Sequence, residues 1–83
     1  MIDKEKFQIA LGSVIRNLRE ELNMTQDELA GKCGYTSENK RSTINKIESG
    51  KSDLPATKIV AIAKALNINP AELLSMAERK TEQ

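Results

Sequence analysis

The sequence predicts an all-α protein, a single domain of five short helices spanning residues 1–83. Apolar residues recur at spacings of three and four, helix-start and helix-stop residues bracket five segments, and no segment alternates like a strand. With one Phe and one Tyr in 83 residues, the core is expected to be aliphatic and small. Helices this short are marginal in isolation, so packing between them must stabilise the domain.

The first helix is expected over residues 4–22. Asp3 is placed to cap its start, and Asn23 to end it. A single apolar stripe runs between these two residues at helical spacing, and we expect it to face the core. The stripe consists of Phe7, Leu11, Val14, Ile15, Leu18 and Leu22.

A second helix is expected over residues 26–33. Thr25 and Glu28 stand three apart at its start, which is the spacing of a capping box. Gly34 follows where helices often end in the left-handed conformation. Cys33 is interpreted as a small buried hydrophobe rather than a reactive thiol. The core residues of this helix are Leu29, Ala30 and Cys33.

A third helix is expected over residues 41–49, closed by Gly50. It carries only two apolar residues, Ile44 and Ile47, which lie three apart on one face. A helix with so little apolar surface must rest on a larger body and direct its other side chains outward. These are long cationic and amide side chains, which reach phosphates and base edges. Residues 25–50 therefore indicate a helix-turn-helix that binds DNA.

The connection between these two helices, residues 35–40, is long for such a turn, where about three or four residues are usual. Either the turn makes an excursion, or Thr36 or Ser37 caps a longer third helix that starts near Glu38. The sequence leaves both alternatives open. The Tyr35 ring is expected at the edge of the core, with its hydroxyl in water.

Two further helices complete the domain, over residues 56–66 and 70–79. The last one has a strong start, with Asn69 as N-cap and Pro70 in the first position. Residues 80–83 are expected to fray. The fourth helix is apolar over much of its circumference and is therefore expected at the centre of the bundle. Its expected buried residues are Ile59, Val60, Ile62, Ala63 and Leu66.

The formal net charge is only +1, but its distribution is uneven. Residues 1–31 carry four Lys or Arg against six Asp or Glu, residues 32–52 carry five against two, and residues 53–83 carry four of each. The positive charge therefore concentrates on the candidate DNA-reading segment, which favours an anionic partner. A solvated charged surface remains the alternative on charge alone.

The composition argues against several other classes of protein. The chain has no His and a single Cys, so neither an internal disulfide nor a zinc site is expected. It has no glycine-rich phosphate loop and no paired acids in a plausible cleft, so we expect no enzyme and no cofactor. Without an apolar run of the ~20 residues that a membrane span needs, and without a signal-peptide core, a cytoplasmic protein is expected, associated with the nucleoid when bound to DNA.

Three motifs in order resemble the lambda-repressor-like (Xre/Cro-type) helix-turn-helix family. They read L-x-M-T-Q-x-E-L-A-x-K-x-G, then R-S-T-I-x-K-I-E-x-G-K, then I-x-A-I-A-K-A-L-N-I-x-P-x-E-L-L, within residues 14–76. The chain looks closest to bacterial and prophage repressors. The resemblance implies a five-helix lambda-repressor-like domain that regulates transcription by binding double-stranded DNA. It also implies a repressor that binds a palindromic operator as a homodimer, with no small-molecule ligand evident.

The resemblance assigns roles to individual residues. Gln26 resembles the family glutamine that grips a phosphate, while Arg41 is matched to guanine, Asn45 to adenine, and Lys46 to guanine or a phosphate. The connection before the third helix is about three residues longer than is usual in the family. This leaves open whether Lys40 occupies the family position that faces the DNA. The complete set of expected DNA contacts is Gln26, Lys40, Arg41, Ser42, Thr43, Asn45, Lys46, Ser49 and Lys51.

Two further features follow from the resemblance. Glu48 resembles the family glutamate that pairs with an arginine of the first helix, here Arg19, and this pair is expected to be structural. The candidates for a dimer interface are Ile68, Leu73, Leu74 and Met76, with ordinary core residues as the alternative. An antitoxin, or another protein-binding module of the same fold, is the alternative function.

Overall fold

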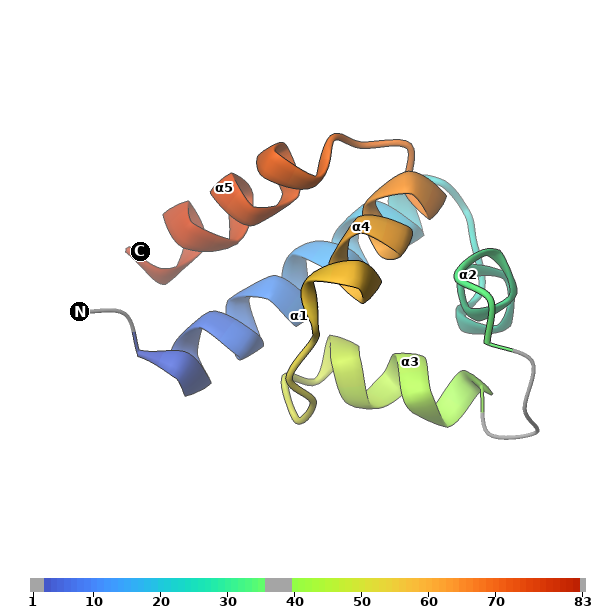
Figure 1. Ribbon diagram of the computed structural model, residues 1–83, viewed down its shortest axis with the longest axis horizontal. Helices are drawn as coiled ribbons and strands as arrows, with labels where there is room; N and C mark the ends of the chain where they lie inside the picture. The colour runs from blue at the N-terminus through green and yellow to red at the C-terminus, as the bar shows by residue number, and fades with distance from the viewer. Residues whose placement is uncertain (1–2, 36–39, 83) are drawn as a thin grey trace.

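The computed structural model describes residues 3–35 and 40–82, and all regular structure within them is helical. The helices are α1 (Lys4–Glu21), α2 (Gln26–Lys32), α3 (Lys40–Glu48), α4 (Ala56–Ala65) and α5 (Pro70–Thr81) (Figure 1). The expected all-α, five-helix fold is confirmed, and each helix begins within one residue of its expected start. The alternatives for the connection before α3 concern residues 36–39, which lie outside the described residues.

Local capping chemistry explains where three of the helices start. The Asp3 carboxylate accepts a hydrogen bond from the Lys6 backbone N–H at 3.1 Å, and Thr25 and Glu28 form a complete capping box with both bonds at 3.0 Å. The Asn69 side chain caps α5 through the Ala71 N–H. The chain turns after each of α1 to α4 through a residue at positive φ, and these residues are Asn23, Gly34, Gly50 and Asn67.

The longest helix, α1, organises the bundle. Its most extensive packing is against α5 and α3, which lie on either side of it, while α2 packs on α3 and α4 (Figure 1). The expectation that the fourth helix lies at the centre is therefore wrong. Only one face of α4 is buried, and its Val60 is 40% exposed instead of belonging to the core.

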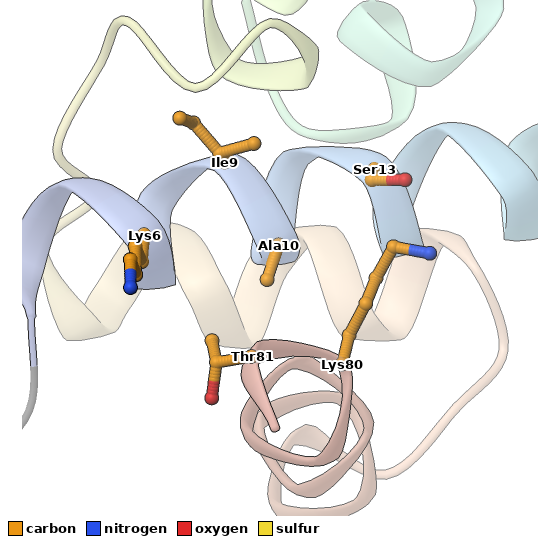
Figure 2. Close-up of a pocket in the computed structure, with 6 residues that line it drawn as sticks. All are labelled: Lys6, Ile9, Ala10, Ser13, Lys80 and Thr81. Carbon is orange, nitrogen blue, oxygen red and sulfur yellow. The ribbon is translucent and has the colours of Figure 1, made fainter. Parts of the chain in front are cut away.

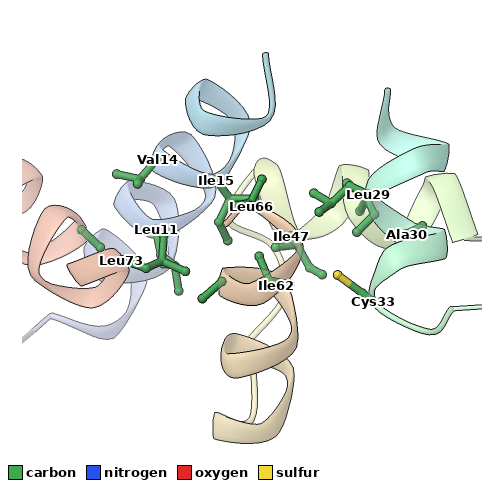
Figure 3. Close-up of a cluster of buried hydrophobic side chains, with 13 residues drawn as sticks. Leu11, Val14, Ile15, Leu29, Ala30, Cys33, Ile47, Ile62, Leu66 and Leu73 are labelled. Atoms are coloured by element: carbon green, nitrogen blue, oxygen red, sulfur yellow. The ribbon is translucent and has the colours of Figure 1, made fainter. Parts of the chain in front are cut away.

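Each helix contributes one large, fully buried aliphatic side chain to a shared core (Figure 3). Burial of such a side chain contributes about 1.5–3 kcal/mol to stability. Cys33 joins the same cluster, as expected from its size and neighbours. Because α3 is attached to this cluster by two isoleucines, the core determines how α3 is presented to solvent. These five large side chains are Ile15, Leu29, Ile44, Ile62 and Leu73.

Two further expectations about helix ends are corrected. Leu22, expected in the apolar stripe of α1, is 47% exposed because it is the C-cap residue, and the chain turns away at Asn23. The fifth helix continues through Lys80 to Thr81 instead of fraying after residue 79, and the Thr81 hydroxyl donates to the Glu78 carbonyl at 2.6 Å. Residue 83 lies outside the described residues.

Candidate nucleic-acid interface

α3 divides into a buried apolar face and an exposed polar face. Ile44 and Ile47 are buried in the core, and Thr43 is half-buried. Apart from Thr43 and the buried Glu48, the polar side chains described for residues 41–51 are exposed to solvent. The helix therefore presents hydrogen-bonding and cationic groups on the side away from the bundle. The exposed side chains are Arg41, Ser42, Asn45, Lys46, Ser49 and Lys51.

A glycine of α1 brings the end of α3 very close to the bundle. A Cβ atom added at Gly12 would lie 2.6 Å from the backbone oxygen of Glu48 and closer still to that of Ile47. These neighbours are backbone atoms, so they cannot move aside as a flexible side chain can. Gly12 therefore sets how closely α3 approaches α1, and with it the position of the exposed face.

Arg19 and Glu48 form a forked, buried ion pair between α1 and α3. The Arg19 Nε lies 2.6 Å from Glu48 Oε2, its Nη2 lies 3.0 Å from Oε1, and its Nη1 donates to the Met24 carbonyl at 2.8 Å. The side chains are only 11% and 4% exposed. The hydrogen bond to Glu48 raises the pKa of Arg19 above its ordinary value. The pair joins α3 to α1 and to the turn before α2, so it holds α3 in place on the bundle.

Gln26 belongs to the same network. Its side-chain amide Nε2 donates to Glu48 Oε1 at 3.1 Å, so α2 is also linked to the end of α3. This contact was not predicted, since the resemblance assigned Gln26 to a phosphate. The network borders a polar hollow of about 170 Å³ between α1, α2 and α3. The hollow is lined by Arg16, Arg19, Gln26, Asn45, Glu48 and Ser49.

A second forked ion pair lies at the other end of α3. The Arg41 Nη2 lies 2.7 Å from Asp27 Oδ2 and its Nε 3.4 Å from Oδ1, while the two side chains are 71% and 38% exposed. The hydrogen bond to Asp27 raises the pKa of Arg41. The contact of Asp27 was not predicted, because an acidic residue in the first turn of a helix is expected from the helix dipole alone. No spacing rule relates it to a residue of another helix.

The remaining residues expected to contact DNA lie on or near this face. Ser49 donates its hydroxyl to the Lys46 carbonyl at 3.2 Å, so this side chain lies against the last turn of α3. Lys51 lies one residue beyond the left-handed Gly50 and is exposed. The side chain of Lys40 lies outside what the structure describes.

The dimer candidates occupy two different environments. Leu73 is fully buried, which assigns it to the core because it does not reach the surface where a partner would bind. Ile68, Leu74 and Met76 are half-buried. Met76 lines a hollow of about 300 Å³ between α1 and α5. Its other lining residues are Val14, Asn17, Leu18, Glu21, Arg79 and Lys80.

A further groove, of about 320 Å³, lies between the first half of α1 and the end of α5 (Figure 2). Its lining side chains are Lys6, Ile9, Ala10, Ser13, Lys80 and Thr81. None of them belongs to α2 or α3, so this groove is not part of the candidate interface.

Two further polar side chains at the edge of the core, those of Cys33 and Tyr35, have structural roles. Burial raises the pKa of the Cys33 thiol above its ordinary value, as is typical of a structural rather than a reactive cysteine. The half-buried Tyr35 ring packs against the core, and Lys58 Nζ lies 4.5 Å from its centroid. Within the described ranges, no three His, Cys, Asp or Glu side chains gather into a metal site, and no helix is long and apolar enough to cross a membrane.

A five-helix bundle that presents one half-buried polar helix beside a short capped helix defines a helix-turn-helix DNA-binding protein. More particularly, the chain belongs to the lambda-repressor-like (Xre/Cro-type) helix-turn-helix family, whose helix-turn-helix model matches residues 15–73. It is also similar to the restriction-modification controller protein C.AhdI from Aeromonas hydrophila, known from a high-resolution crystal structure. The two share 30% identity and a TM-score of 0.71, over 80% of this chain and 94% of that one. None of the curated proteins matches the chain. DNA binding and transcription regulation are therefore its functional class.

Proposed function

We propose that the protein is a repressor that binds a palindromic operator in double-stranded DNA as a homodimer. The observation that carries this proposal is the division of α3, which buries Ile44 and Ile47 and exposes four polar side chains, those of Arg41, Ser42, Asn45 and Lys46. A helix that is anchored on one face and polar on the other fits the major groove, which is wide enough to admit it. Similarity to a controller protein supports a regulator.

The bases would be read by three exposed side chains of α3. Arg41 matches the two acceptors of guanine, Asn45 matches the acceptor and donor of adenine, and Lys46 reaches guanine or a phosphate. All three are exposed on α3, and Asn45 also borders the hollow shared with α1 and α2. Ser42 and Thr43 supply shorter contacts to the same groove. Lys40 stands at the first position of α3 and completes the proposed set of groove contacts.

The DNA backbone would be held by groups around this helix. Lys51 and Ser49 follow α3 on its exposed side, and the half-buried Gln26 lines the hollow next to Asn45. To grip a phosphate, the Gln26 amide would share its donors between Glu48 and the DNA, which its two N–H bonds permit. Such contacts set position and register and add sequence-independent affinity.

A dimer extends the short site that one monomer reads. Two copies of α3 would enter successive major grooves about 34 Å apart, and the operator would then share the two-fold symmetry of the protein. Ile68, Leu74 and Met76 are the candidates for the contact, because they combine partial exposure with positions on or just before α5. Occupying a promoter in this way would repress transcription by excluding polymerase.

Selection from a random duplex library, with sequencing of the bound fraction, tests the proposal. Enrichment of a palindrome with half-sites one helical turn apart is the expected result. A variant with Arg41→Ala, Asn45→Ala and Lys46→Ala serves as the control and should enrich nothing, while its thermal unfolding stays close to that of the wild type. If the wild type enriches no sequence, the proposed repressor function is wrong for this chain, and the alternative, an antitoxin or another protein-binding module of the same fold, takes its place.

A further inference from the structure

The geometry of the Arg41–Asp27 pair determines which part of the guanidinium faces outward. The Asp27 carboxylate accepts from Nε and Nη2, which together form one edge of the planar group. The opposite donors, on Nη1 and the outer side of Nη2, bond no side chain among residues 3–35 and 40–82. A guanidinium has two edges able to make paired hydrogen bonds, and here the protein occupies one of them.

The outward edge matches the chemistry of one base. Guanine presents N7 and O6 side by side in the major groove, and two parallel N–H donors from one arginine satisfy both acceptors. With its other edge held by a carboxylate, Arg41 offers these donors in a fixed plane rather than as a mobile side chain. Less rotamer freedom is then lost on binding.

We propose that Asp27 is a specificity-determining positioning residue, which holds Arg41 by one edge so that its other edge reads a single guanine. This inference rests on the proposed DNA-binding function. Asp27 acts through Arg41 and contacts no base itself. It lies in the first turn of α2, so that α2 takes part in sequence reading through a side-chain contact to α3.

The charge of Asp27 contributes to specificity in a second way. Its carboxylate is 38% exposed beside the cationic end of α3, so it partly offsets the attraction of Arg41 for any phosphate. On non-cognate DNA this reduces affinity without a compensating contact. On the cognate site the guanine contact remains. Both effects increase the ratio of specific to non-specific binding.

The test compares Asp27→Asn with the wild type, on the cognate duplex found by selection and on variants of it at the base read by Arg41. We expect the preference for guanine at that position to fall about tenfold, which corresponds to the loss of one well-formed bidentate contact. Affinity for random duplex should rise at the same time. The matched control is Glu72→Gln, which removes the carboxylate of an exposed Arg79–Glu72 pair on α5 and should change neither quantity.

A double-mutant cycle separates positioning from a general change of charge. In an Arg41→Ala background, Asp27→Asn should leave the base preference unchanged, because the residue through which Asp27 acts is absent. Arg41→Lys provides a second test of positioning, since an ammonium has no edge by which Asp27 could hold it. This variant should lose the preference for guanine whether or not Asp27 is present. Thermal unfolding of each variant confirms that it is folded.

Different results would refute the positioning role of Asp27 and the proposed DNA-binding function. Unchanged guanine preference in Asp27→Asn, or an equal loss in the Arg41→Ala background, would overturn the positioning role while DNA recognition stands. Tighter cognate binding by Asp27→Asn with guanine preference retained would also overturn it, because Asp27 would then restrain Arg41 instead of presenting it. If the wild type selects no sequence at all, both proposals are wrong.

Discussion

Two arginine–carboxylate pairs connect α3 to other helices, and they differ mainly in their exposure to water. Arg19–Glu48, at the end of α3, is nearly completely buried, whereas Arg41–Asp27, at its beginning, is largely exposed. Both are forked, with shortest distances of 2.6 and 2.7 Å. The same chemistry therefore occurs in two different environments at the two ends of one nine-residue helix.

Burial is the physical reason for the difference. Removing one partner of a buried pair leaves an uncompensated charge in a low-dielectric environment, which is strongly destabilising. An exposed pair is screened by water and contributes little to stability, so its arginine can accept a new partner at small cost. The buried pair can therefore only hold α3 in place, whereas the exposed pair leaves one edge of its arginine open to a ligand.

The largest expected effect is on folding, from Glu48→Ala. The change strips Arg19 of its carboxylate and should lower the free energy of unfolding by about 3–5 kcal/mol. Urea denaturation measures it, and Asp27→Ala, the same truncation in the exposed pair, should cost only a small part of that loss. A wild-type melting temperature for Glu48→Ala would contradict the assigned role of the buried pair.

A double replacement tests whether an uncompensated buried charge is what destabilises the Glu48→Ala variant. Arg19→Met combined with Glu48→Leu removes both charges together and keeps most of the packing volume. Because no uncompensated charge remains, we expect stability to recover most of the way toward the wild type. Equal instability of the single and double variants would indicate that the fork itself, rather than charge compensation, stabilises the α1–α3 contact.

The next largest effect on stability is expected at Gly12, where α1 and α3 approach closely and the buried pair forms. Gly12→Ala forces α1 and α3 apart at the backbone of residues 47 and 48, and should destabilise the fold by about 1–3 kcal/mol. Gly31→Ala is the matched control, because an added Cβ there meets nothing within 4 Å and α2 gains helix propensity of about 0.5–1 kcal/mol. Opposite changes in melting temperature are expected, and a neutral Gly12→Ala would contradict the tight crossing.

At the exposed pair the expected effect moves from folding to recognition. Arg41→Ala should reduce cognate affinity about tenfold or more and relax the preference at one base position, with a melting temperature close to the wild type. Titrations on the selected duplex and its single-base variants measure both. An equal loss on every sequence would reassign Arg41 to the DNA backbone.

The smallest effect is expected at Lys51, a cation with no ion-pair partner among the described residues. Without a carboxylate to orient it, Lys51 should act as a point charge toward phosphate. Lys51→Ala should weaken binding evenly across sequences and reduce the slope of log affinity against log salt by about one. Affinities measured across a salt series test this, and an unchanged slope would remove Lys51 from the phosphate contacts.

The sequence by itself determined the features that depend on neighbouring residues. The starts of the five helices, the capping box of Thr25 and Glu28 and the anchoring face of Ile44 and Ile47 follow from short-range spacing and capping chemistry. Where the apolar pattern was used to predict burial, it erred at two residues. Leu22 and Val60 fit the pattern and yet are exposed, because burial depends on where the chain turns and on which helices are adjacent.

Only the tertiary structure decided which side chains meet across helices. The pairing of Arg41 with Asp27 and the contact of Gln26 with Glu48 both join residues at least 14 positions apart. The Arg19–Glu48 pair was expected from family resemblance and not from spacing. Such contacts depend on how α2 and α3 cross over the core and how closely Gly12 admits α3. That geometry arises from packing of the whole bundle, so no local pattern encodes it.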